Sequence, residues 1–122
     1  MKPIIIKVSL NDKFNNFSYP IFIGNGLLSN CEEILKKFVL KRKVILIHDN
    51  FFSLKKNDNK QFISFVETIK KLCESVNLIG IPGGDKTKNF SQLEKVLEES
   101  LSFNIDRSSL IIAFGGGVIG DL

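Results

Sequence analysis

The glycines at positions 115–117 are the residues of this chain that point most directly to chemistry. They follow the apolar segment Leu110–Phe114, which is typical of a buried strand, and precede Val118 and Ile119, which are typical of a helix start. Glycine in such a turn accepts a positive φ and has no Cβ to keep a phosphate away from the backbone amides. A helix start adds partial positive charge. This order predicts a site for an anionic, nucleotide-like ligand.

Two further loops carry polar and glycine residues directly after a predicted strand. His48 and Asp49 follow the apolar run 43–47, and the loop 83–88 follows the strand predicted at 76–81. In open α/β sheets, ligands bind beyond the carboxyl ends of the strands. We therefore expect these two loops and the glycine turn to meet at one edge of a sheet. Their convergence is a stronger argument for a site than any single loop.

Several of these side chains have two interpretations that the sequence leaves open. Asp49 is suited to accept hydrogen bonds from both hydroxyls of a ribose, but it is equally suited to cap a turn or a helix. Asp121 is either a ligand contact or a carboxylate that complements the helix dipole. His48, the single histidine, is predicted to be a partly exposed strand-end residue rather than a base or a metal ligand.

The loop after the strand at 76–81 combines a flexible turn with opposite charges. Gly83 and Gly84 permit a tight turn, Asp85 offers a carboxylate and Lys88 offers an ammonium group. Together they are suited to hold a hydroxyl-rich part and a phosphate-bearing part of one ligand, although turns that bind nothing often contain the same residues. The glycine triplet does not match G-x-G-x-x-G, so the standard dinucleotide-binding fingerprint is not met.

The order of predicted elements indicates an α/β fold. Segments 4–10 and 17–23 are expected to form a β-hairpin around a polar turn at 11–16. The elements after it alternate: helix 29–38, strand 43–47, helix 62–73, strand 76–81, helix 91–101, strand 110–114 and a helix start at 118. Such alternation predicts a Rossmann-like layered domain with a mainly parallel sheet, preceded by the N-terminal β-hairpin.

Capping boxes are expected at two of the helix starts, because Ser29 with Glu32, and Ser91 with Glu94, have the required spacing. The last predicted helix begins only a few residues before the sequence ends at Leu122. An apolar helix start is an unusual natural end for a chain. We therefore expect residues 1–122 to form one domain of a longer protein.

Composition excludes several classes of function. With 122 residues, 43% of them hydrophobic and 25% charged, the chain is typical of one soluble domain, and no apolar run is long enough for a membrane span. The net charge of +4 comes from scattered lysines, with Arg42 and Arg107 as the only arginines, so no nucleic-acid partner is expected. Cys31 and Cys73 lie outside any CxxC spacing. We expect them to pack on helix faces, in a protein of the reducing cytoplasm.

The segment IIAFGGGVIGDL, with its strand, three glycines and Gly-Asp pair, resembles the signature of the 3-dehydroquinate synthase family. The resemblance extends along the whole chain. YPIFIGNGLL is similar to the family's second strand and following turn, VILIHDN to its ribose-binding strand end, and IPGGDKTKNF to its Gly-Glu-x-x-Lys loop. The glycine signature is specific, and the other segments support it through their order and spacing.

The resemblance implies that the three loops bind NAD, with Asp49 near the adenosine ribose. The implied cofactor-binding residues are Asp49, Gly83, Gly84, Asp85, Lys88, Gly115, Gly116, Gly117, Val118, Ile119, Gly120 and Asp121. Three positions depart from the family pattern. Asp85 stands where glutamate is usual and has a shorter reach, Gly83 replaces a common acidic residue, and Thr87 replaces a frequent aromatic residue.

The resemblance also implies a function for the whole protein. It would be a cytoplasmic lyase of the shikimate pathway that converts 3-deoxy-arabino-heptulosonate 7-phosphate to 3-dehydroquinate and phosphate with catalytic NAD. A divalent metal, zinc or cobalt, would be held by a glutamate and two histidines of a second, helical domain, and the full-length protein would be a homodimer. These 122 residues would supply neither a catalytic residue nor a metal ligand, and would be inactive alone.

Other readings stay open. One is a different enzyme with the same cofactor-binding half, either another sugar-phosphate cyclase or a glycerol-dehydrogenase-like metal enzyme. Those dehydrogenases typically have serine after the glycine triplet, where this chain has Val118. The other reading is a stand-alone nucleotide-binding module without catalysis.

Overall fold

The computed structural model describes residues 2–10, 18–54 and 58–122 of the chain. The chain divides into two compact units, Met1–Asn30 and Cys31–Leu122. Among the described residues, no helix has both the length and the apolar run that crossing a membrane requires.

The first unit contains the predicted hairpin. Strands β1 (Ile4–Val8) and β2 (Tyr19–Ile23) pair antiparallel, with Ile4 opposite Ile23. A short 3-10 helix, η1 (Leu28–Asn30), follows. The polar turn predicted at 11–16 lies outside the described residues. The antiparallel register thus confirms the predicted hairpin, with strands somewhat shorter than the segments predicted.

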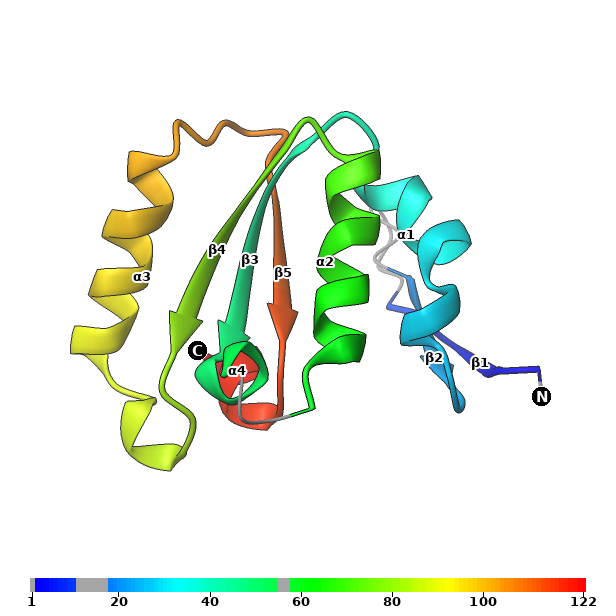
Figure 1. The fold of residues 1–122 in the computed structure, drawn as a ribbon, viewed down its shortest axis with the longest axis horizontal. Coiled ribbons are helices and arrows are strands. Elements are labelled where there is room, and N and C mark those ends of the chain that lie inside the picture. The colour runs from blue at the N-terminus through cyan, green and yellow to red at the C-terminus, as the bar shows by residue number, and fades with distance from the viewer. Residues whose placement is uncertain (1, 11–17, 55–57) are drawn as a thin grey trace. The chain divides into compact units, whose positions relative to one another are not determined.

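The second unit is built on a three-stranded parallel sheet (Figure 1). Strand β3 (Lys43–Asp49) is central and pairs with β4 (Ser75–Ile81) on one side and with β5 (Leu110–Phe114) on the other. This confirms the predicted α/β fold with a parallel sheet. Because β3 runs two residues further than the sequence predicts, His48 and Asp49 belong to the strand and not to a loop.

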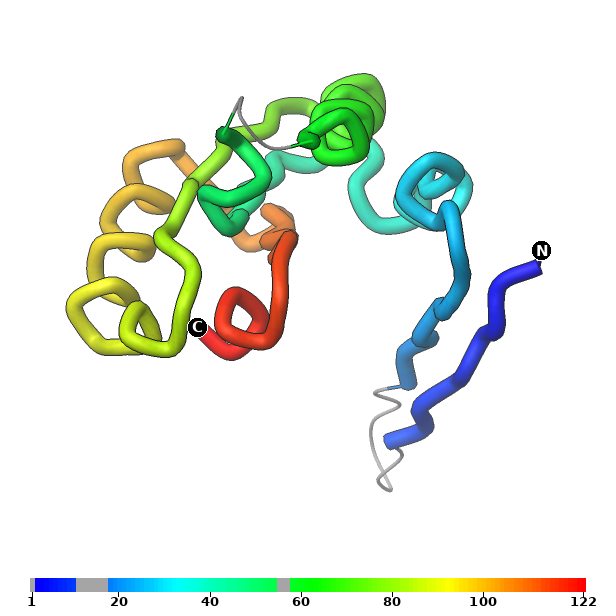
Figure 2. The backbone as a smooth tube through the Cα atoms, turned by 60° about the horizontal axis from the view of Figure 1, so that its bottom comes forward, coloured from blue at the N-terminus to red at the C-terminus, as the bar shows by residue number. Residues whose placement is uncertain are grey.

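The helices of this unit form two layers around the sheet. They are α1 (Glu32–Val39), α2 (Lys60–Leu72), α3 (Phe90–Ser102) and α4 (Gly117–Asp121), with the 3-10 helices η2 (Asn50–Ser53) and η3 (Asp85–Thr87) between them. Figure 2 shows α2 on one side of the strands and α3 with α4 on the other. Alternate residues of β3 therefore face two different hydrophobic layers.

The layer beneath α2 is aromatic. Phe114, at the end of β5, packs against Phe62 and Phe65 of α2, with ring centroids 5.1 Å apart in each pair. Phe52 of η2 lies edge-on to Phe114, and His48 lies 4.9 Å from Phe62. This cluster covers the carboxyl ends of β3 and β5 on the α2 side.

The opposite layer is aliphatic. Ile45 of β3, with Ile79 and Ile81 of β4, forms a buried cluster with Val96 of α3 and Ile119 of α4. These side chains are at most 5% exposed. The short helix α4 is thus fixed to the sheet by one apolar side chain, and its remaining residues stay near the surface.

Both predicted capping boxes are wrong. Helix α1 begins after Cys31, whose side chain makes no capping hydrogen bond, and Ser29 lies within η1. Helix α3 begins at Phe90, one residue earlier than predicted, and its cap is Asn89, whose Oδ1 accepts a hydrogen bond of 2.9 Å from the Gln92 N–H. Asn89 with Gln92 has the spacing of a capping box too, and the earlier of two overlapping signals is the one used.

The cysteines lie at helix ends rather than on helix faces, which corrects the prediction. Cys31 precedes α1 and Cys73 follows α2. Both are free thiols, and burial raises the pKa of each of them. A cysteine beside a helix end can still pack as a small apolar residue, so such packing does not require a position on a helix face.

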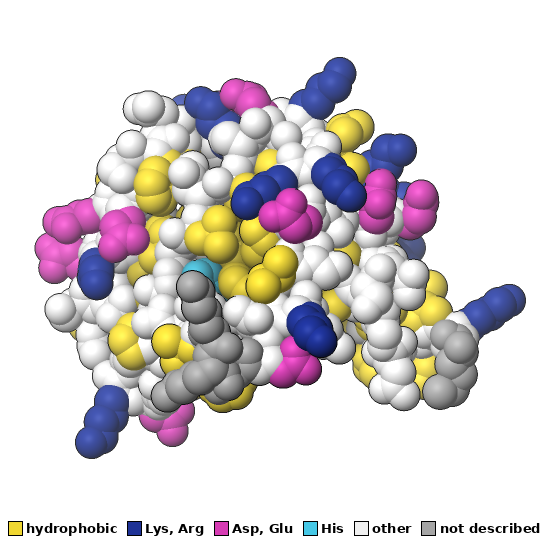
Figure 3. Space-filling model, in the orientation of Figure 1, with side chains coloured by type: hydrophobic (Ala, Val, Ile, Leu, Met, Phe, Trp, Pro, Cys, Tyr) yellow, Lys and Arg dark blue, Asp and Glu magenta, His cyan; other side chains and the backbone are white. Residues whose placement is uncertain are grey.

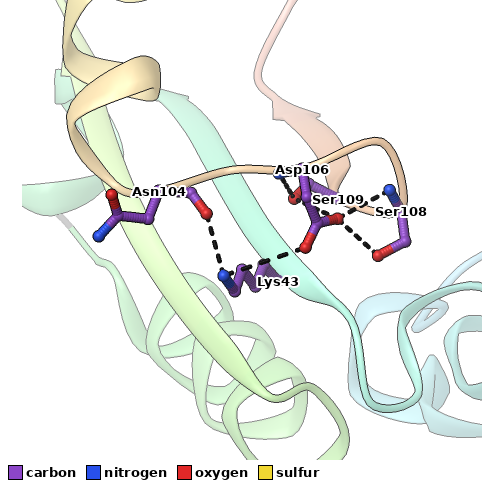
Figure 4. Close-up of polar contacts among 5 residues, drawn as sticks. All are labelled: Lys43, Asn104, Asp106, Ser108 and Ser109. Carbon is purple, nitrogen blue, oxygen red and sulfur yellow. Dashed lines mark hydrogen bonds and ion pairs between the residues drawn. The ribbon is translucent and has the colours of Figure 1, made fainter.

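At the amino ends of the strands, a polar cluster fixes the turn before β5 (Figure 4). Lys43 Nζ donates to the Asn104 carbonyl at 3.0 Å and lies 4.0 Å from Asp106 Oδ2. Asp106 Oδ1 accepts hydrogen bonds from the Ser108 N–H and hydroxyl, at 2.8 and 2.6 Å. The Ser108 hydrogen bonds, with a smaller contribution from Lys43, hold the pKa of Asp106 below its usual value.

Gly80 of β4 leaves room for two neighbours from β3 and η2, which leads to a prediction about stability. A Cβ at Gly80 would overlap Asn50 Oδ1 and lie 3.1 Å from His48 Cε1. We expect Gly80→Ala to lower the free energy of unfolding by about 1–3 kcal/mol, because overpacking forces neighbours out of place. Urea denaturation measures this. The control is Gly120→Ala, where a Cβ meets no described atom within 4 Å. Equal stability of the two variants would contradict the prediction.

Candidate functional site

The carboxyl ends of β3, β4 and β5 lie at one edge of the sheet, because all three strands are parallel. Asp49 pairs with Ile81 across β3 and β4, and His48 pairs with Phe114 across β3 and β5. The segments that follow these ends are η2, the loop with η3, and the glycine turn with α4 (Figure 1). These are the three segments that the sequence predicts to meet.

Asp49 is the residue where the three segments come together. Its Oδ1 accepts a hydrogen bond of 2.9 Å from the Phe51 N–H and so caps η2. A Cβ on Gly83 would lie 2.5 Å from Asp49 Oδ2, and a Cβ on Gly115 would lie 3.6 Å from Asp49 Cβ. The cap interpretation is therefore correct for Oδ1. Oδ2 accepts no hydrogen bond from the described residues and stays available to a ligand.

His48 is buried, which corrects the expectation of a partly exposed residue. Its side chain packs on Phe62 of α2, and the residue is only 5% exposed. Its Nδ1 lies 3.1 Å from the Asp49 carbonyl oxygen. Because a carbonyl oxygen only accepts, Nδ1 carries the proton. His48 thus holds the backbone of Asp49 in place through this hydrogen bond.

The loop after β4 turns sharply at Gly84. Gly84 has a φ of 107°, which a side chain would disfavour. The Thr87 hydroxyl donates to the Gly84 carbonyl at 2.6 Å and closes the turn of η3. Asp85 is exposed, and no described residue forms a hydrogen bond or an ion pair with its carboxylate. The carboxylate is thus free to contact a ligand at this edge.

Lys88 and Asp121 join the loop after β4 to α4. Lys88 Nζ lies 3.0 Å from Asp121 Oδ2, and the two side chains are 52% and 61% exposed. Such an exposed pair contributes only about 0–1 kcal/mol to stability. A ligand phosphate can therefore compete for the Lys88 ammonium at little cost. The pair lines a groove of about 550 Å³ together with Asn89, Phe90, Leu93 and Leu122.

The glycine turn has one glycine that packs inward and others that face open space. A Cβ on Gly115 would lie 2.6 Å from Ile119 Cγ1, so this glycine permits α4 to approach β5. At Gly116, Gly117 and Gly120, a Cβ would meet no described atom within 4 Å. Gly116 has a φ of −81° and Gly117 is helical, so neither needs a positive φ. A side chain added at any of these three positions would therefore enter open space.

Asn89 is a residue of this region that sequence reasoning missed. Besides capping α3, its Nδ2 donates to the Lys86 carbonyl at 2.8 Å. It therefore ties η3 to the start of α3 and fixes where Lys88 lies. The capping-box spacing of Asn89 with Gln92 could have revealed it.

The charges and donor types limit what this edge can hold. Among the described residues, no group of three or more histidine, cysteine, aspartate or glutamate side chains is arranged to hold a metal ion. In the face shown in Figure 3, basic and acidic side chains are interspersed. A fixed carboxylate, an exposed ammonium and open glycine amides instead suit a ligand with both hydroxyl and phosphate groups.

Comparison with known proteins gives these observations a family context. Residues 78–122 match the family model for the N-terminal part of 3-dehydroquinate synthase. The chain is 33% identical to a 3-dehydroquinate synthase from Mesorhizobium japonicum, with 99% of the chain and 30% of the relative covered. It is 38% identical to the enzyme from Clostridium kluyveri, with 86% of the chain and 28% of the relative covered.

The fold also has solved counterparts. A complex of 2-deoxy-scyllo-inosose synthase with carbaglucose-6-phosphate, NAD+ and Co2+ superposes with a TM-score of 0.70 at 20% identity. The match covers 96% of this chain and 29% of that one.

The chain spans about 30% of the length of the curated relatives it matches. It belongs to the 3-dehydroquinate synthase family and corresponds to the amino-terminal part of those proteins.

Proposed function

We propose that the carboxyl edge of the β4–β3–β5 sheet binds NAD, and that the chain is the cofactor-binding part of a 3-dehydroquinate synthase. The observation that carries this proposal is the Asp49 carboxylate. It is fixed by the Phe51 N–H where all three loops come together, and it keeps one oxygen for a ligand. Family membership supports the choice of NAD over other nucleotides.

The residues present fit this cofactor. Asp49 Oδ2 would accept the hydroxyls of a ribose, and the Lys88 ammonium would bind a phosphate oxygen of the pyrophosphate. The amides around Gly116 and Gly117 would contact the rest of the cofactor, because an absent Cβ leaves their approach open. The other members of the proposed site, Gly83, Gly84, Asp85, Gly115, Val118, Ile119, Gly120 and Asp121, shape the two loops or contact the cofactor from them.

In the whole protein, the proposed substrate is 3-deoxy-arabino-heptulosonate 7-phosphate, and the products are 3-dehydroquinate and phosphate. NAD, when bound, would supply a temporary oxidation of a ring alcohol that is reversed within the same turnover. The role of this chain is to orient the cofactor. The divalent metal does not fit the described residues, so the proposal places its ligands outside them.

The proposal extends to the setting of the whole protein. By analogy with the family, it is a cytoplasmic homodimer that binds a sugar phosphate and NAD. Residues 1–122 would act in it as the NAD-binding domain. The position of Val118 after the glycine triplet favours the synthase over a glycerol-dehydrogenase-like enzyme.

A turnover assay tests this division of roles. We expect these 122 residues, assayed alone with NAD, a divalent metal and the heptulosonate phosphate, to release no phosphate above background. The physical reason is that the described residues hold no metal-binding group. The positive control is a 3-dehydroquinate synthase of full family length in the same assay. Phosphate release by the 122-residue chain would contradict the proposal that catalysis needs residues outside it.

A further inference from the structure

Gly83 has a spatial role that the family pattern does not indicate. Its φ is not positive, so its backbone conformation is open to any residue. A Cβ at this position, however, would lie 2.5 Å from Asp49 Oδ2 and 3.0 Å from both Asp49 Cγ and Oδ1. Real Cβ atoms do not approach other atoms as closely as 2.5 Å. The whole carboxylate of Asp49 therefore occupies the space that a side chain at residue 83 would need.

The orientation of that carboxylate has two causes. The Phe51 N–H donates to Oδ1 at 2.9 Å. The bare Cα of Gly83 lets Oδ2 lie against the loop after β4. A side chain at residue 83 would force either the carboxylate away from Phe51 or the loop away from the sheet. The hydrogen bond and the glycine thus fix the carboxylate together.

We propose that Gly83 is a positioning residue for the Asp49 carboxylate, and through it for the ribose of the cofactor. The consequence for the cofactor rests on the proposed function, whereas the coupling between Gly83 and Asp49 does not.

A double-mutant cycle tests the coupling. Gly83→Ala in the complete protein should lower the melting temperature by about 2 °C or more, because the added Cβ overlaps the Asp49 carboxylate. In an Asp49→Ala background, the same substitution should have little effect, because the three carboxylate atoms are gone. The control is Gly116→Ala, whose Cβ meets no described atom within 4 Å and whose effect should be the same in both backgrounds.

A second measurement separates positioning from a purely structural role. Gly83→Ala should raise the Kd for NAD roughly tenfold or more in the wild-type background, and less than about threefold in the Asp49→Ala background. The NMR shift of the Phe51 amide should change in Gly83→Ala, because its acceptor moves. The proposal would be overturned if Gly83→Ala changed the melting temperature and the NAD affinity equally in both backgrounds. In that case the loop after β4, and not the Asp49 carboxylate, would move to make room for the added methyl group.

The outcomes also separate this proposal from the proposed function. If the unsubstituted protein binds no NAD but the melting temperatures remain coupled, the cofactor assignment fails and the positioning of Asp49 by Gly83 stands. If NAD binds and the substitutions act independently, the cofactor assignment stands and the positioning role fails.

Discussion

Gly117→Val is expected to abolish measurable NAD binding while the fold stays intact. The added isopropyl group would fill the open space beside the first turn of α4, where we place the cofactor. We expect the Kd to rise about a hundredfold or more, which is roughly 2.8 kcal/mol. The free energy of unfolding should change by less than about 1 kcal/mol, because Gly117 is helical and valine is tolerated in helices. Isothermal titration calorimetry and urea denaturation measure the two quantities.

The matched control is Ser64→Val, which adds the same branched side chain at an exposed position of α2. It should leave the affinity for NAD unchanged. Gly117→Ala should fall between wild type and Gly117→Val. An affinity of Gly117→Val within about threefold of wild type, roughly 0.7 kcal/mol, would mean that Gly117 is only a structural turn.

Asp49→Ala is expected to weaken NAD binding by about 1.5–3 kcal/mol, the usual contribution of a hydrogen bond to a charged group. NADP should lose less, because the carboxylate that is removed also repels a 2′-phosphate. The ratio of the two affinities, measured by calorimetry, should therefore shift toward NADP. The substitution also removes the cap of η2, which costs about 0.5–2 kcal/mol of stability.

Asp49→Asn separates the two roles of this side chain. An asparagine oxygen can still accept from the Phe51 N–H, so the stability of the chain should be nearly kept. The negative charge is lost, so NADP should bind more tightly than in wild type. If Asp49→Ala changes the melting temperature but neither affinity, Asp49 is a cap and nothing more.

The sequence predicts the order of helices and strands well, because the spacing of apolar residues reflects which face of each element is buried. Phe62, Phe65 and Ile69 recur at helical spacing and are all buried in α2. The apolar run of β3 lies between two hydrophobic layers, as expected for a central parallel strand. The sequence offers overlapping cap signals at Asn89 and Ser91, and the structure shows that Asn89 caps α3 and also donates to the Lys86 carbonyl.

The convergence of the three loops could be predicted from the parallel sheet, but the contacts among them could not. Lys88 pairs with Asp121, 33 positions along the chain, because their segments follow the carboxyl ends of β4 and β5, the parallel strands on either side of β3. The burial of His48 depends on Phe62, which the alternation within β3 does not reveal. Likewise, the need for Gly83 becomes visible only once the Asp49 carboxylate is placed against it.

The most direct test of the account is a titration of the isotope-labelled protein with NAD, followed by amide NMR. We predict saturable shifts at the end of β3 with η2, in the loop 83–88 and in the turn 115–121, and none along α1 or at the turn fixed by Lys43 and Asp106. Binding should weaken as salt is added, because Lys88 is exposed and its attraction for a phosphate is screened. Saturation without shifts in these three segments, or no binding at millimolar NAD, would contradict the proposed cofactor site.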